Sequence, residues 1–123
     1  MAADEKDIAN KLADEGLIDS RKIYCLGTLN KRDAGYLFGA LGGMASTVNS
    51  MVYICLNGEE LIITKLDLET VVFRRNIADI KIEKLTTGFL GGKLVYRMDG
   101  KRVSFDCSND FVKAFAPIVG MKI

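Results

Sequence analysis

Histidine is absent from the 123-residue sequence, and its absence excludes several kinds of active site. Histidine is the commonest general base and the commonest metal ligand, because its pKa lies close to neutral pH. A chain without it has no Ser-His or Cys-His nucleophile pair and no histidine-containing zinc site. Carboxylates then become the first candidates for catalysis.

Two carboxylates, Asp79 and Glu83, fall on one face of a predicted strand, an arrangement that general acid–base catalysis can use. Pairs of this kind usually lie on a solvated surface, and no other reactive residue converges on them. A small barrel is also filled by side chains rather than hollow. We therefore predict that the protein is not an enzyme and has no catalytic, cofactor-binding or metal-binding residue and no cofactor.

An excess of charge of one sign is also missing. The chain has 17 basic and 16 acidic residues, which gives a net charge of +1. Such a balance produces no field over the whole protein that would attract nucleic acid. We expect no nucleic-acid partner.

Cysteines are few, and their number is odd. Cys25, Cys55 and Cys107 lie far apart, each among apolar residues of a predicted strand, so we expect three reduced, buried thiols. Residues 1–7 contain no basic segment followed by an apolar one, as a secretory signal would. Reduced thiols and the missing signal together predict a cytoplasmic protein.

Short apolar runs separated by turns fill residues 51–107. Asn57 and Gly58 favour a type I′ hairpin turn, and Asp99 and Gly100 indicate a second tight turn. The predicted strands cover residues 21–29, 51–56, 60–66, 70–75, 77–86, 93–98 and 101–107. Strands in succession followed by one helix predict an antiparallel sheet.

The strand at residues 77–86 contains a break in its alternation. Ile80 and Ile82 fall on one face, but Leu85 is out of phase with them. An extra residue in one strand would bring Leu85 back to the same face as Ile80 and Ile82, so we expect a bulge or bend nearby.

Helical periodicity appears at both ends of the chain. Residues 4–15 have a narrow apolar side formed by Ile8 and Leu12, so we expect this helix to make only a limited contact. The second helix begins at an N-cap of Ser108 or Asn109 and ends near Pro117. Its apolar side, formed by Phe111, Phe115 and Ile118, is expected to fill the open end of the barrel.

The sequence therefore predicts a mainly β fold in one domain over residues 1–123. A bent antiparallel barrel of seven strands, capped by the C-terminal helix, occupies residues 21–119. Residues 1–19 form an N-terminal helical extension, and residues 33–50 form a glycine-rich insertion between the first two strands.

The insertion is the candidate interaction surface. Residues 34–58 carry no charge, and the part before the second strand forms either a loop or a short helix. A membrane-spanning helix is less favoured, because residues 34–50 would extend only about 25 Å, short of the roughly 30 Å hydrocarbon core. An exposed apolar cluster normally marks an interaction surface. The candidate residues are Tyr36, Leu37, Phe38, Leu41 and Met44.

The pattern resembles a known family, the bacterial pleckstrin-homology-like (PH-like) domains, which are similar in turn to the GRAM type. The resemblance rests on the strand-turn-strand unit at residues 52–64, the step into the next strand at 76–83, the hairpin at 99–105 and the helix at 111–119. It covers about residues 21–119 and implies the seven-stranded barrel with its C-terminal helix.

The resemblance also implies a non-enzymatic binding or assembly module. Members that bind phosphoinositides carry a basic cluster in the first strand pair, where this chain has only Lys31 and Arg32. We expect a cytoplasmic, bacterial module that binds a protein partner or associates with further copies of itself. The alternative is peripheral membrane association, a weak contact with lipid headgroups made through residues 34–50.

Overall fold

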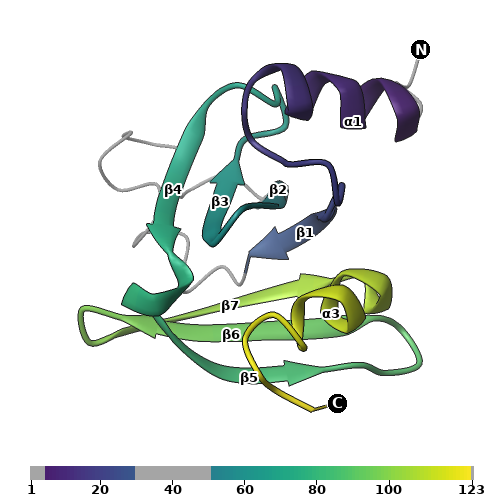
Figure 1. Ribbon diagram of the computed structural model, residues 1–123. Helices are drawn as coiled ribbons and strands as arrows, with labels where there is room; N and C mark the ends of the chain where they lie inside the picture. The colour runs from purple at the N-terminus through teal and green to yellow at the C-terminus, as the bar shows by residue number, and fades with distance from the viewer. Residues whose placement is uncertain (1–4, 30–50, 123) are drawn as a thin grey trace.

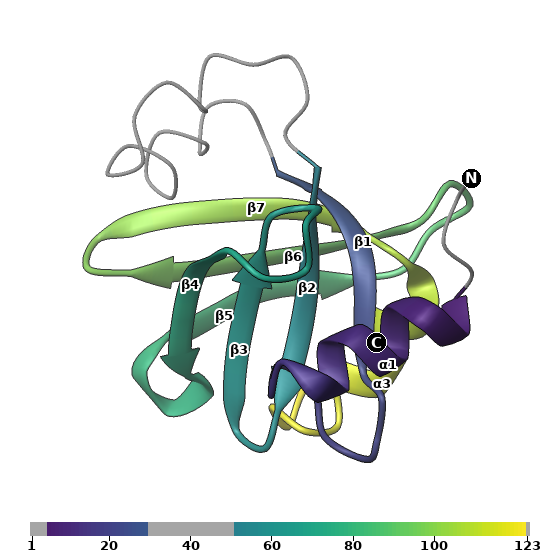
Figure 2. The same ribbon diagram turned by 90° about the horizontal axis from the view of Figure 1, so that it is seen from above.

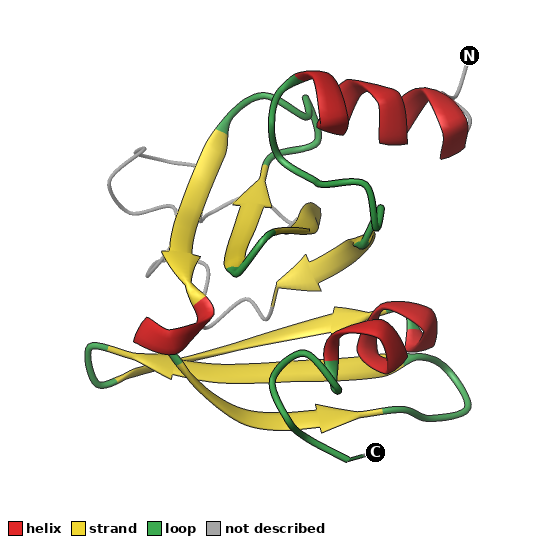
Figure 3. Cartoon of the chain, in the orientation of Figure 1, coloured by secondary structure: helices red, strands yellow, loops and turns green. Residues whose placement is uncertain are grey.

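Two α-helices flank seven β-strands in the computed structural model, which describes residues 5–29 and 51–122 (Figures 1 and 3). In chain order the elements are α1 (Glu5–Asp14), β1 (Tyr24–Leu29), β2 (Met51–Asn57), β3 (Glu60–Thr64), β4 (Val71–Asn76), the 3-10 helix η3 (Ile77–Asp79), β5 (Lys81–Thr86), β6 (Gly92–Met98), β7 (Lys101–Cys107) and α3 (Asn109–Phe115). This confirms the predicted mainly β fold with a helix at each end.

The strands form one antiparallel sheet in the order β4-β3-β2-β1-β7-β6-β5. Figure 2 shows β1 to β4 running steeply across β5 to β7, so the sheet is bent into two facing halves. The first strand joins the halves, because β1 pairs with β2 from Tyr24 to Thr28 and with β7 only at Thr28 and Leu29. The order of strands is consistent with the topology of PH-like domains.

The β2–β3 hairpin is present as predicted, but its turn type differs from the prediction. Asn57 pairs with Glu60, so the two loop residues are Gly58 and Glu59. Gly58 has a φ of +60°, whereas Asn57 and Glu59 have no positive φ. A single positive φ at the first loop position is the pattern of a type II′ turn. Asn57 therefore lies at the end of β2 and not in the turn. Its side chain donates a 2.7 Å hydrogen bond from Nδ2 to the Gly16 carbonyl oxygen.

The β6–β7 hairpin confirms the second predicted turn. Met98 pairs with Lys101, and both loop residues, Asp99 and Gly100, have positive φ values, of 53° and 77°. This is the pattern of a type I′ turn, whose twist matches that of the flanking strands.

The predicted break in the fifth strand is a bulge. The register between β5 and β6 shifts between Ile82 and Lys84, which leaves Glu83 as the extra residue. The shift places Leu85 in the core on the same side as Ile82, although three positions separate them. The strand also begins later than expected, because the Asn76 side chain caps η3 before it.

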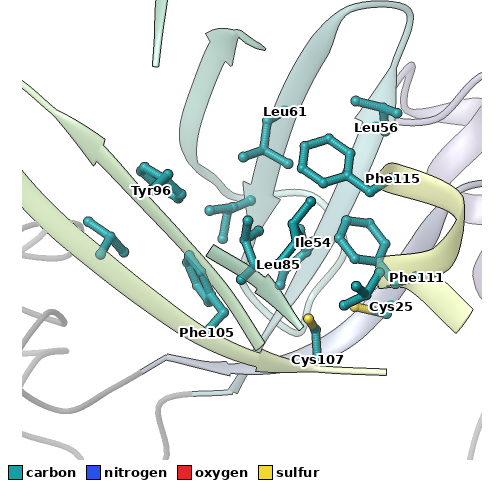
Figure 4. Packing of buried hydrophobic residues seen from close by; sticks show 14 of the residues in the cluster. Cys25, Ile54, Leu56, Leu61, Leu85, Tyr96, Phe105, Cys107, Phe111 and Phe115 are labelled. Carbon is teal, nitrogen blue, oxygen red and sulfur yellow. The ribbon is translucent and has the colours of Figure 1, made fainter. Parts of the chain in front are cut away.

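The main core fills the inside of the bend, and α3 completes it (Figure 4). Phe111 and Phe115 are buried with their ring centroids 5.5 Å apart, and Ile118 packs against the same cluster. Ser108 is the N-cap, since its Oγ accepts a 3.1 Å hydrogen bond from the Phe111 backbone N–H. Ser108 is one of the two caps predicted from the sequence, and the predicted apolar face of this helix is confirmed. The largest fully buried side chains include Ile54, Leu56, Leu61, Leu94, Tyr96 and Phe105.

A second, smaller core lies on the outer face of β2 and β3, under α1. Leu12 is fully buried there against Cys55 and Ile62, and Leu17 and Ile18 complete the cluster. The contact is wider than the narrow one expected from the sequence. The reason is that the segment after the helix contributes two further apolar side chains to it.

The segment between α1 and β1 is fastened to the β2–β3 turn. The Asp19 carboxylate accepts hydrogen bonds from Arg21 Nη2 at 2.6 Å and from the Gly58 backbone N–H at 2.7 Å. Arg21 Nη2 also donates to the Gly58 carbonyl oxygen at 2.7 Å. The Arg21 guanidinium, followed by the Gly58 N–H, holds the pKa of Asp19 well below its usual range.

Candidate interaction surface

The predicted interaction residues fall in the part of the chain that the structure does not describe. Tyr36, Leu37, Phe38, Leu41 and Met44 all lie between residues 30 and 50, so this prediction remains a prediction. A candidate surface therefore has to be built from residues 5–29 and 51–122.

The β5–β6 connection carries two apolar side chains into solvent. Phe89 is 100% exposed and Leu90 is 95% exposed. The next most exposed large hydrophobic side chain in the described ranges, Leu66, is 46% exposed. Figure 1 shows this connection extending past the ends of the strands. We refer to Phe89 and Leu90 together as the Phe89 tip.

The base of the Phe89 tip is held against α3. Asn109 bonds Gly88 twice, accepting from the Gly88 N–H at 3.2 Å and donating from Nδ2 to the Gly88 carbonyl oxygen at 2.9 Å. Gly92 packs so closely on the helix that a Cβ atom there would lie 2.7 Å from Val112 Cγ2. The tip is therefore displayed from an anchored base, although its two side chains make no core contact.

Sequence patterns did not single out the Phe89 tip. Phe89 and Leu90 stand between Gly88 and Gly91, in a connection between two predicted strands. The alternation of apolar and polar residues indicates burial only within strands. It therefore says nothing about whether residues in a connection between strands are buried. Whether a partner element covers an apolar pair of this kind is decided by tertiary structure.

Two lysines lie beside the base of the tip, and a third lies on α3. Lys84 and Lys93 line a shallow hollow of about 490 Å³ beneath Leu90. Lys113 lies one helical turn after Asn109, on the same side of α3. Asp106 lies beside Lys93, and the distance between Asp106 Oδ1 and Lys93 Nζ is 3.9 Å. Both side chains are largely exposed, so this ion pair is weak.

A groove runs between α1, the start of β1 and the start of α3. Its volume is about 520 Å³. Apolar side chains, including Ile8, Leu26 and Tyr53, share its lining with the charged side chains of Arg21, Lys22 and Asp110. Cys25 also borders this groove.

The two carboxylates weighed for catalysis lie in different elements. Asp79 ends η3, whereas Glu83 is the bulge residue of β5. Arg97 Nε bonds Glu83 at 3.0 Å, and Arg102 Nε lies 3.3 Å from it. The hydrogen bond from Arg97 lowers the pKa of Glu83, as expected of a carboxylate in an ion pair. Residues 5–29 and 51–122 contain no cluster of three acidic or cysteine side chains able to hold a metal.

The helices that the structure describes are too short or too polar to cross a membrane. All three cysteines are free and buried, as predicted.

Comparison of the chain with protein families, with curated proteins and with solved structures found no match. The assignment that the geometry supports is therefore a seven-stranded antiparallel sheet with a C-terminal helix, consistent with PH-like topology.

Proposed function

We propose that the protein is a non-enzymatic binding module of PH-like fold that attaches to its target through the Phe89 tip. The full exposure of Phe89 and Leu90 carries the proposal. Elsewhere in the described chain the large apolar side chains are at least half covered. Two adjacent apolar side chains held in water by an anchored loop have a free-energy cost that binding removes.

The target that suits this surface best is an anionic membrane. The Phe89 tip is convex, and a bilayer accepts a convex apolar tip without a matching pocket. Burying Phe89 and Leu90 in the acyl region contributes roughly 1.5 to 3 kcal/mol each. Lysines near an anionic surface contribute about 1 kcal/mol each. Lys84 and Lys93, which line the same hollow as Leu90, can contribute in this way, and Asp106 reduces the total.

These magnitudes give a weak, reversible attachment. They place the module on the membrane surface, since the tip offers only two side chains for insertion. A protein partner or a second copy of the chain, as the sequence suggested, would need a pocket shaped to receive the tip.

Vesicle flotation tests the proposal. The full chain is mixed at low salt with vesicles of neutral lipid, or with vesicles that also contain an anionic lipid. We expect flotation with the anionic vesicles, and at least a tenfold loss of binding in the double variant Phe89→Asp, Leu90→Asp. The matched control is Leu66→Asp, which adds one charge at another exposed leucine and should float like the wild type.

Light scattering on the same proteins distinguishes a membrane from a protein target. If the wild type does not float but forms dimers that the double variant lacks, the tip binds a second copy, and the membrane assignment is wrong. If the double variant floats and associates like the wild type, the Phe89 tip is not the binding surface and the proposed function fails.

A further inference from the structure

Two of the three thiols face each other inside the bent sheet. Cys25 on β1 and Cys107 at the end of β7 belong to the main core, and Figure 4 shows their sulfur atoms beside one another. The two side chains are close enough to interact, and the Cys107 thiol favours the Cys25 thiolate by donating a hydrogen bond to it. The third thiol, Cys55, belongs to the outer core on the opposite face of the sheet.

The facing pair bridges the weakest junction of the sheet. Beyond Thr28 and Leu29, β1 leaves β7, and Cys25 lies in the part of β1 that β7 no longer pairs. Cys107 immediately precedes the N-cap of α3 and lines the hollow beneath Leu90. A covalent link here would add a second connection between the two halves of the sheet.

Access and reactivity differ among the three thiols. Cys25 borders the groove between α1 and α3, which gives a small oxidant a route toward its side chain. The hydrogen bond from Cys107, with others from Ser108, lowers the pKa of Cys25 and thereby favours its thiolate. Burial raises the pKa of Cys55 to about 12, so Cys55 stays protonated and inert.

We propose that Cys25 and Cys107 are the site of a reversible intrachain disulfide, formed when the chain meets hydrogen peroxide. The Cys25 thiolate attacks one peroxide oxygen, the O–O bond breaks, hydroxide leaves and Cys25 becomes a sulfenic acid. Cys107 then loses its proton and attacks the Cys25 sulfur, so that the S–O bond breaks, water leaves and the S–S bond forms. The two sulfur atoms together give two electrons to the peroxide. An external dithiol reverses the reaction by exchange.

Thiol counting and peptide mapping of the full chain test the site. The reduced chain has three thiols. Brief treatment of the native chain with hydrogen peroxide, followed by alkylation in denaturant, should leave one thiol, and a dithiol should restore all three. Digestion without reduction should yield one linked pair of peptides, containing Cys25 and Cys107.

The serine variants provide matched controls. Cys55→Ser should form the same link and retain no thiol, and Cys25→Ser should keep both remaining thiols. Cys107→Ser should lose the Cys25 thiol to sulfenic acid, keep only the Cys55 thiol and form no intrachain link. Three thiols surviving treatment of the wild type, or a link that involves Cys55 or a second chain, would overturn the proposal.

A stability measurement on the wild type does not depend on whether the variants fold. The bridged chain should unfold at a higher urea concentration than the reduced chain, because the bridge closes a long loop that restricts the unfolded state. A lower midpoint would mean that oxidation forces the thiols out of their native arrangement, and it would overturn the assignment to a native-state pair.

Discussion

The two helices make contact with opposite faces of the same sheet, and the shorter one completes the larger core. α1 has ten residues and α3 has seven. α3 places Phe111 and Phe115 inside the bend, where they join the main core. α1 covers the outer face with Leu12 and Ala9 and depends on Leu17 and Ile18 beyond its end. The difference shows that the contribution of a helix to the core depends more on the face of the sheet that it covers, and on the side chains that it buries there, than on its length.

The helices also differ in how they are fixed at their ends. A side-chain cap at Ser108 starts α3, and the helix ends just before Pro117. α1 ends at Asp14 and is followed by Gly16, whose φ is +71°, and the chain beyond is held by the bonds among Asp19, Arg21 and Gly58. The outer core therefore depends on a polar network as well as on apolar contact.

Removing the ring of Phe115 should produce the largest loss of stability. The side chain is fully buried, so Phe115→Ala leaves a cavity and is expected to cost about 3 to 5 kcal/mol of unfolding free energy. Urea unfolding followed by circular dichroism measures it. A loss below about 1 kcal/mol would show that α3 does not complete the main core.

Leu12→Ala should follow, with a loss of about 2 to 3 kcal/mol, because Leu12 is fully buried against Cys55 and Ile62. This replaces the sequence-based expectation of a limited contact for the N-terminal helix. The control is Asn10→Ala, an exposed position on the same helix that should change little. A larger loss for Leu12→Ala than for Phe115→Ala would reverse the ranking of the two helices.

Asp19→Asn should weaken the fastening of α1 by on the order of 1.5 kcal/mol at pH 7, because it removes a charge that accepts hydrogen bonds. The pKa of Asp19 is lowered in the folded state from its ordinary value of 3.8. Its contribution is therefore complete above that pH and is lost as the pH falls toward the folded-state pKa. Urea midpoints of the two proteins should differ at pH 7 and converge in strong acid. A constant difference would show that the carboxylate charge is not involved.

Ser108→Ala should have the smallest effect, about 1 kcal/mol, because it removes one cap from α3 and leaves the buried rings in place. Ser108→Asp restores an oxygen acceptor and should recover most of the loss. If the alanine variant were as damaging as Phe115→Ala, the cap rather than the rings would position the helix.

The sequence predicted those elements in which local pattern and burial agree. In β7, Val103, Phe105 and Cys107 alternate with half-buried or exposed positions, and the strand occupies the predicted range. In β1, by contrast, Leu26 is as apolar as its neighbours but is exposed, while Cys25 and Leu29 are buried. An apolar residue in a short strand does not reveal which face is covered.

The extent of the outer core and the exposure of the Phe89 tip escaped prediction for a related reason. β2 and β3 are covered on both faces, so Cys55 and Leu56 are buried although they point in opposite directions. Such strands are continuous apolar runs that carry no sign of the second contact. Likewise, the exposure of Phe89 depends on the absence of a covering element within the described chain.

The position of β1 sets the order in which the fold can be completed. β1 is the first strand of the chain but lies in the middle of the sheet, where Leu29 pairs with Phe105. In a growing chain on the ribosome, β1 can pair with β2 early. The other edge of β1 pairs with β7, and this pairing cannot form until β7 has been synthesised. Contacts between residues so distant in sequence slow folding, because the loop between them has to be closed first. We therefore expect the sheet to close only after synthesis is nearly finished, with the two hairpins, β2–β3 and β6–β7, forming earlier.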